Sequence, residues 1–153
     1  MNSPAIALPS QLAAAAQDLR LARQGLEKTL TFVREQARPW AHSGLDKAVD
    51  DPYIIGKFGD LQIRIDVADA LYQRAEQFIG SAPETLVATA EAVIASADAL
   101  QAVGIVQQEL TGSRPASLSQ EGREPLRWQY QIIGNYRLNG VVPPQLQESF
   151  DAP

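Results

Sequence analysis

The 153-residue chain contains no cysteine and a single histidine, His42. The absence of cysteine excludes disulfides, thiolate metal sites and cysteine nucleophiles. A di-iron site in a helical bundle needs Glu-x-x-His pairs from two helices, and serine–histidine hydrolysis needs a base beside a nucleophile elbow. One histidine in a connecting segment meets neither requirement, so we predict His42 to be a surface loop residue. The sequence therefore predicts no metal site and no catalytic residue.

Positive charge is also scarce, because 13 Lys and Arg face 18 Asp and Glu, for a formal net charge of −5. This balance argues against nucleic-acid binding, which usually needs a basic face. Residues 1–16 are apolar but carry no Lys or Arg and are interrupted by Pro4 and Pro9, so they do not fit a signal peptide. No later segment is expected to be long enough to span a membrane. We expect a soluble, cytoplasmic protein with no nucleic-acid or membrane partner.

Strand signals and a glycine-rich phosphate loop are missing too, and the strongest pattern is a helical one in residues 51–79. Asp51 and Pro52 are typical of a helix start, since the carboxylate can cap free N–H groups and proline needs no hydrogen bond there. Apolar residues then recur at steps of three and four. These are Ile54, Phe58, Leu61, Ile65, Ala68, Tyr72, Ala75 and Ile79, with a second row at Ile63, Val67, Leu71 and Phe78. So wide an apolar face predicts the central helix of a bundle.

Two further long helices are predicted on either side of this segment. The first spans residues 10–37, with Leu19, Leu26 and Val33 on its apolar face, and ends before a proline. The other spans residues 81–110 and begins with Ser81 and Glu84, which have capping-box spacing. Its middle is rich in alanine, which would let a neighbouring backbone approach closely.

A shorter fourth helix is predicted to begin at Pro125 and to end at Asn139 and Gly140. We expect its inward residues to be Leu126, Tyr130 and Ile133. Residues 1–9 and 143–153 are expected to be a flexible N-terminal tail and an extended C-terminal tail around a bundle domain of residues 10–142. The predicted fold is all-α: an antiparallel four-helix bundle of three long helices and one short one.

Three stretches of the sequence together resemble the C-terminal helical domain of the acyl-CoA dehydrogenase superfamily. The first, residues 32–40, reads FVREQARPW. The second is Ala48–Tyr53, AVDDPY, followed by FGDL at residues 58–61. The third, residues 128–144, reads WQYQIIGNYRLNGVVPP. In this order they are most similar to the branch of flavin-dependent sulfur-acquisition and dibenzothiophene-type monooxygenases.

The resemblance implies an acyl-CoA-dehydrogenase-like bundle whose flavin lies between it and a β-domain. In that family the bundles of neighbouring subunits pack into a tetramer, and both dehydrogenase and monooxygenase chemistry need a β-domain and a further helical domain. The implied cofactor is FAD or FMN, held only with a partner or with those domains, and the chain alone is expected to bind none or to be inactive. The implied partners are further copies of the chain, as a homo-oligomer, or a flavoprotein subunit, as a hetero-oligomer.

The chain departs from the family pattern at two places. Gln36 stands where the family offers an arginine for the flavin pyrophosphate, and glutamine lacks the charge and the fork that suit phosphate. The connection of residues 111–125 is shorter than in the family, with Gln120, Arg123 and Glu124 where that motif has two histidines and an aspartate.

The resemblance assigns cofactor-binding positions to Gln36, Arg38, Trp40, Arg123, Tyr136 and Asn139. Two alternatives from the residues themselves stay open. Arg38, Pro39 and Trp40 could instead form a helix stop with Trp40 over the bundle end. Tyr136, Asn139 and Gly140 could instead form a helix C-cap with an aromatic anchor. The sequence accordingly supports two functions: the bundle portion of a flavin-dependent oxidoreductase or monooxygenase that needs a partner, or a non-catalytic association module of the same ancestry. A free-standing bundle with a small apolar ligand between its helices is a third hypothesis.

Overall fold

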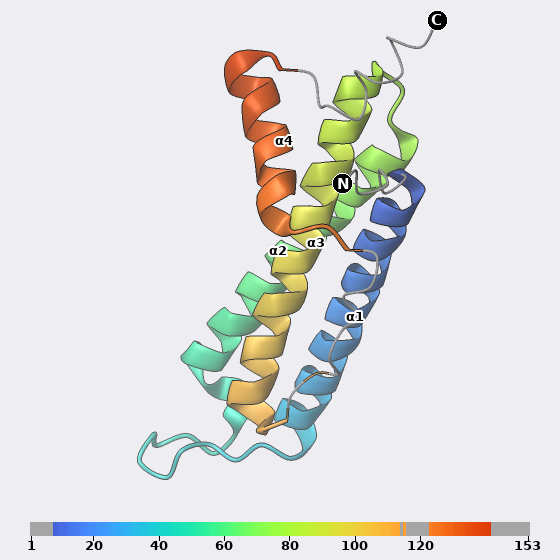
Figure 1. Ribbon diagram of the computed structural model, residues 1–153. Helices are drawn as coiled ribbons and strands as arrows, with labels where there is room; N and C mark the ends of the chain where they lie inside the picture. Colours follow the sequence, from blue (N-terminus) through green and yellow to red (C-terminus); the bar gives the residue numbers. More distant parts are fainter. Residues whose placement is uncertain (1–7, 114, 116–122, 142–153) are drawn as a thin grey trace, which may run out of the picture.

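The computed structural model describes residues 8–113, 115 and 123–141. In these residues the chain forms four α-helices and one short 3₁₀ helix, and no strand. The three long helices run antiparallel in succession, and the short fourth lies beside the N-terminal half of the third (Figure 1). The elements are α1 (Leu8–Glu35), η1 (Ala48–Asp50), α2 (Pro52–Gln77), α3 (Ala82–Thr111) and α4 (Leu126–Asn139). The predicted all-α bundle of three long helices and one short one is confirmed.

The predicted helix ends follow from local hydrogen bonds. The Asp51 carboxylate accepts a hydrogen bond from the N–H of Tyr53 at 2.9 Å and caps α2. At the start of α3, Ser81 and Glu84 form the full capping box. Gly112, with φ of 76°, closes α3 in the left-handed conformation that glycine adopts without strain. Helix α1 begins two residues before the predicted Ser10, and η1 was not predicted.

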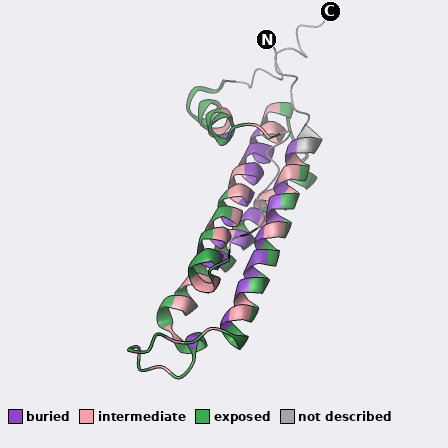
Figure 2. Ribbon diagram, turned by 60° about the horizontal axis from the view of Figure 1, so that its bottom comes forward, coloured by how far each residue is buried: buried purple, intermediate pink, exposed green. Residues whose placement is uncertain are grey.

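The prediction that the second helix is central is wrong, because α3 holds that position. Helix α3 packs against α1, α2 and α4, whereas α2 packs on α3 and less extensively on α1. The alanines of α3 explain this, because small side chains around the helix let neighbours approach on several sides. Buried residues run along the facing sides of the long helices (Figure 2). The main core consists of Leu19, Ala22, Leu26, Leu61, Ile65, Ala68, Ala99, Val103 and Val106.

The second apolar row predicted on α2 is covered only in part. Leu71 and Phe78 pack against a smaller cluster around Ala75 and Ala88. Ile63 and Val67, by contrast, are 65% and 51% exposed. They lie on the side of α2 that faces away from α1 and α3, so this chain provides no covering residue for them among those described. The residue predicted to end the first row, Ile79, lies beyond the helix and is fully exposed.

The inward face predicted for α4 is also wrong in part. Leu126 and Tyr130 are exposed, while Ile133 is half-buried as expected. The fully buried residue is Gln129, whose Nε2 donates a hydrogen bond to Glu124 Oε2 at 2.8 Å. Because α4 packs mainly on α3, only a narrow strip of its surface is covered, and a glutamine with a hydrogen-bond partner can occupy that strip.

Among the described residues, α3 is long and apolar enough to cross a membrane, which corrects the expectation that no later segment would reach that length. Half of its most apolar window is buried inside the bundle. The composition of α3 is therefore that of a core helix packed on three neighbours.

The buried hydroxyl of Ser96 in α3 gives a stability prediction. Its Oγ has no hydrogen-bond partner among the described residues, and the residue is 0% exposed. An unsatisfied buried polar group costs about 1–3 kcal/mol, so Ser96→Ala is expected to stabilise the fold by about 1 kcal/mol in urea unfolding. The control Ser81→Ala removes a cap and is expected to destabilise by about 1 kcal/mol. Loss of stability in Ser96→Ala would show that the hydroxyl is bonded.

Candidate functional site

The first group of predicted site residues follows the C-terminal end of α1. Gln36, Arg38 and Trp40 are exposed, and Trp40 retains 71% of its accessible surface. The Trp40 ring meets the ring of His42 edge-on, with centroids 5.2 Å apart. Trp40 therefore does not cover the bundle end, which corrects that alternative, while the surface position of His42 is confirmed. The three predicted residues present one arginine, one amide and one indole to the outside of the chain.

An apolar recess of about 200 Å³ lies near this end of the bundle, between α1, η1 and the start of α2. It was not predicted from the sequence, because the exposure of Val49 and Ile55 in its wall can be read only from the structure. Its lining residues are Leu30, Val33, Arg34, Val49, Ile54, Ile55 and Phe58.

Tyr53 and Glu109 connect the start of α2 to the end of α3. The Tyr53 hydroxyl donates a short hydrogen bond to Glu109 Oε1. This hydrogen bond, with some loss of solvation, raises the pKa of Tyr53 above its ordinary value. Lys57 Nζ lies 5.1 Å from the centre of the Tyr53 ring.

Among the residues that the structure describes, Arg123 is the one predicted site residue that forms an ion pair with a distant part of the chain. Its Nη1 and Nη2 donate to Asp18 Oδ2 and Oδ1 at 2.8 and 2.7 Å, across 105 residues of sequence. The Asp18 side chain is 1% exposed and that of Arg123 is 16% exposed. This buried bidentate pair fixes the segment before α4 onto α1. Cofactor binding by Arg123 stays a prediction.

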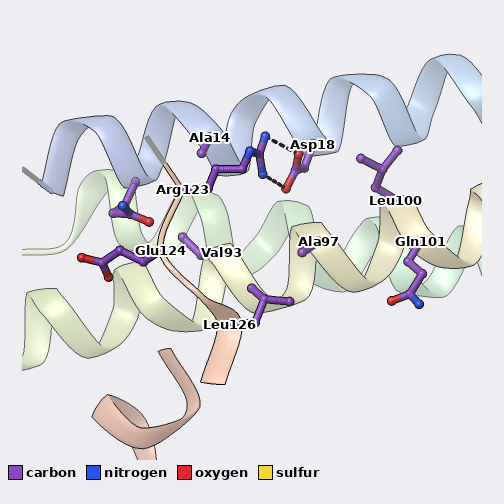
Figure 3. A pocket seen from close by; sticks show the side chains of 10 residues that line it. Ala14, Asp18, Val93, Ala97, Leu100, Gln101, Arg123, Glu124 and Leu126 are labelled. Atoms are coloured by element: carbon purple, nitrogen blue, oxygen red, sulfur yellow. Dashed lines mark hydrogen bonds and ion pairs between the residues drawn. The ribbon is translucent and has the colours of Figure 1, made fainter. Parts of the chain in front are cut away.

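A cavity of about 230 Å³ adjoins this ion pair. Figure 3 shows Arg123 reaching from the segment before α4 to Asp18 on α1, with Ala97 and Leu100 of α3 nearby. The lining is mostly apolar, and its residues are Gln11, Ala14, Asp18, Val93, Ala97, Leu100, Gln101, Arg123, Glu124 and Leu126. In this article it is called the α1–α3 cavity.

The last two predicted site residues lie towards the C-terminal end of α4. Tyr136 is half-buried, and Asn139 is exposed with its Nδ2 donating to Asn135 Oδ1 at 2.9 Å. This end of α4 and the end of α1 that carries Gln36 lie at opposite ends of the bundle (Figure 1). The structure therefore does not bring the six predicted residues together within one chain, and their cofactor contacts stay predictions.

The outer side of α2 forms an exposed apolar surface, which we name the α2 stripe. Its members repeat at steps of three and four, on the side opposite the buried Leu61 and Ile65. They are Gly56, Gly59, Ile63, Val67 and Ala70, all exposed. Arg64 beside the stripe binds Asp60 at 3.0 Å and Asp98 at 2.7 Å. Helix α2 is thus apolar on two opposite faces, only one of which this chain buries.

The chain has both sequence relatives and structural neighbours among known proteins. No family model matches it. It is 41% identical over 64 residues to a dibenzothiophene monooxygenase of Mycolicibacterium goodii, a match that covers 42% of this chain and 15% of that protein. It is 34% identical over 61 residues to the dibenzothiophene monooxygenase of Rhodococcus erythropolis, again over 15% of that protein. The match therefore spans a small part of each relative.

Solved structures share the fold over most of this chain. Dibenzothiophene monooxygenase (TdsC) from a Paenibacillus species, in its indole-bound form, superposes with a TM-score of 0.73 at 23% identity, over 87% of this chain and 40% of that one. Methanesulfinate monooxygenase (MsuC) from Pseudomonas fluorescens gives a TM-score of 0.64 at 22% identity, over 88% and 41%.

The fold class of this chain is a helical bundle of the acyl-CoA dehydrogenase type. Within that class it resembles the C-terminal bundle of the dibenzothiophene-type flavin monooxygenases, as the three motifs indicated. It spans about 40% of the length of the monooxygenase structures that it matches.

Proposed function

We propose that this chain is the bundle portion of a flavin-dependent, monooxygenase-like assembly, whose flavin chemistry needs protein beyond the bundle. The sequence match to dibenzothiophene monooxygenases and the shared fold over 40% of TdsC support this proposal. TdsC has been solved with FMN bound, so FMN is the cofactor we propose for the assembly. We also propose a cytoplasmic location, where a reductase could supply reduced flavin.

The observation that carries the proposal is the α2 stripe. Ile63 and Val67 are more than half exposed although they stand on a regular helix of a well-packed bundle. The glycines Gly56 and Gly59 have no neighbouring atoms above them, so another helix could approach the α2 backbone closely there. A row of this kind is typical of a surface that binds protein.

A second copy of this chain is the covering surface that we propose. Of the charges that border the stripe, Arg64 is paired with Asp60 and Asp98, and Arg74 with Glu91, while Asp66 accepts a hydrogen bond from Gln62. Two stripes could therefore meet around a two-fold axis with most of the charges beside them already paired within each chain.

Placing positive charge on the α2 stripe tests the proposed self-association. The double substitution Ile63→Lys and Val67→Lys is expected to convert an oligomer into a 16.6 kDa monomer, because two ammonium groups cannot be desolvated without partners. Light scattering after gel filtration measures the mass. Helix content should be unchanged, since both side chains point away from the core. The control, Gln62→Lys with Gln73→Lys, adds equal charge beside the stripe and should keep the oligomer. A monomeric wild-type chain would contradict the self-association.

The alternative, a non-catalytic association module, is favoured by two observations. Gln36, an exposed residue, stands where the resemblance to the family implies an arginine, and Arg123 is bound to a buried carboxylate of its own chain. Titration with FMN separates the two functions. If the bundle serves a flavoprotein, the chain alone stays colourless but binds FMN stoichiometrically once the β-domain of the assembly is supplied. If that assembly still bound no FMN, the non-catalytic association module would be the one of the two functions that remains.

A further inference from the structure

We propose that the α1–α3 cavity is a binding site for a small, neutral, mostly apolar molecule that carries one hydrogen-bond acceptor. The site is formed entirely by residues of this chain and does not depend on flavin binding or on association through the α2 stripe. Its evidence is a cavity of suitable size beside a buried amide that lacks a partner.

The size of the cavity suits a single substituted ring. Its volume is about 230 Å³, and an apolar cavity of about 150 Å³ is enough to hold benzene. The space exists because two alanines, Ala14 on α1 and Ala97 on α3, face it where larger side chains would fill it. Val93, Leu100 and Leu126 supply apolar walls (Figure 3). A ring with one short substituent would bury its carbon surface against these side chains.

The polar groups of the cavity favour a neutral ligand. Asp18 and Arg123 are joined by two hydrogen bonds of 2.7 and 2.8 Å. Glu124 accepts a hydrogen bond from Gln129 at 2.8 Å, and its carboxylate points away from Ala97 and Leu100 (Figure 3). A charged ligand would have to lose its own solvation against partners that are already engaged.

Gln11 supplies the reason to expect an acceptor on the ligand. The residue is 6% exposed and lines the cavity, and its Nε2 has no hydrogen-bond partner among the described residues. Buried donors in native proteins are nearly always paired, so an empty donor at a cavity wall indicates a missing partner. A carbonyl oxygen on the ligand would satisfy it and is expected to tighten binding about three- to tenfold over a ligand without it.

Two ligands of nearly equal shape test this inference: acetophenone, which has a carbonyl oxygen, and α-methylstyrene, which has a methylene in its place. Both would be titrated into the full ¹⁵N-labelled chain, with the Gln11 side-chain amide as the reporter. Both are expected to bind saturably, acetophenone about three- to tenfold more tightly, and only acetophenone should shift the Gln11 amide protons strongly downfield. Absence of saturable binding of either ligand to the folded chain would overturn the proposal.

Variants locate the binding and separate its two parts. Gln11→Met keeps the length of the side chain and removes the donor, so it should abolish the preference for acetophenone while both ligands still bind. Ala97→Leu should fill the cavity and prevent binding of both. Ala13→Leu adds the same side chain at an exposed position of α1 and should leave binding unchanged.

If Ala97→Leu fails to fold by circular dichroism, Ala14→Leu fills the same space from α1. Binding that survives a folded cavity-filling variant would place the ligand elsewhere and overturn the site. A preference for acetophenone that survives Gln11→Met would overturn the role of the amide.

Discussion

Replacing Arg123 with methionine is expected to lower the free energy of unfolding by about 3–5 kcal/mol, because Asp18 would remain as a buried carboxylate without its partner. Asp18 is 1% exposed, so its carboxylate would stay largely buried after the two hydrogen bonds are lost. Urea unfolding followed by circular dichroism measures the change. The effect should exceed that of most single substitutions in this chain.

Two further variants separate the lost pair from the lost side chain. Arg74→Met breaks an exposed ion pair with Glu91, of 2.9 Å, and is expected to cost less than about 1 kcal/mol. The double variant Asp18→Leu with Arg123→Met removes both charges and should recover most of the stability, since buried ion pairs can be replaced by apolar residues. Equal costs for Arg123→Met and Arg74→Met would contradict a buried, structural pair.

Gly25→Ala is expected to destabilise the bundle by about 1–3 kcal/mol, although alanine is the better helix former. A Cβ atom at Gly25 would lie 2.7 Å from Cγ1 of Val103 and 3.1 Å from Oε1 of Gln107. The branched Val103 side chain has little rotational freedom within α3, so the helices α1 and α3 would have to move apart. Thermal unfolding measures the loss.

The matched control for this substitution is Gly134→Ala in α4. No atom lies within 4 Å of a Cβ built there, so alanine should stabilise that helix by about 0.5–1 kcal/mol through propensity alone. Val103→Ala, which truncates a core residue, should cost less stability in the Gly25→Ala background than in the wild type, because it also removes the clashing methyl. If Gly25→Ala and Gly134→Ala change the stability in the same direction and by a similar amount, the close approach of α1 and α3 is not a constraint on the fold.

The parts of the fold predicted from sequence are those set by neighbouring residues. Helix starts at Asp51 and Ser81 and the end at Gly112 depend on contacts within four residues, and the structure confirms them. The apolar face of α1 was equally readable, because one periodic row determines one buried side. Which helix is central depends instead on how many other helices pack against each helix. The periodicity of apolar residues in the sequence does not give that number.

The candidate site was less predictable because it depends on contacts distant in sequence. The pairing of Asp18 with Arg123 joins residues 105 positions apart. The sequence did contain a signal for this ion pair. Asp18 lies between Ala15 and Ala22 on the buried side of α1, where a carboxylate needs a cationic partner. The exposure of Ile63 could not be predicted, because an apolar residue is compatible with the core of the chain or with a contact to another one.

Photo-crosslinking at position 63 tests the central claim, that other protein covers the α2 stripe, most directly. p-Benzoylphenylalanine would be placed at Ile63 and, as a control, at the exposed Gln24 of α1 in the purified full chain. Irradiation is expected to produce a covalent dimer from the chain labelled at position 63 and none from the chain labelled at position 24. Uncrosslinked monomer at both positions would contradict it.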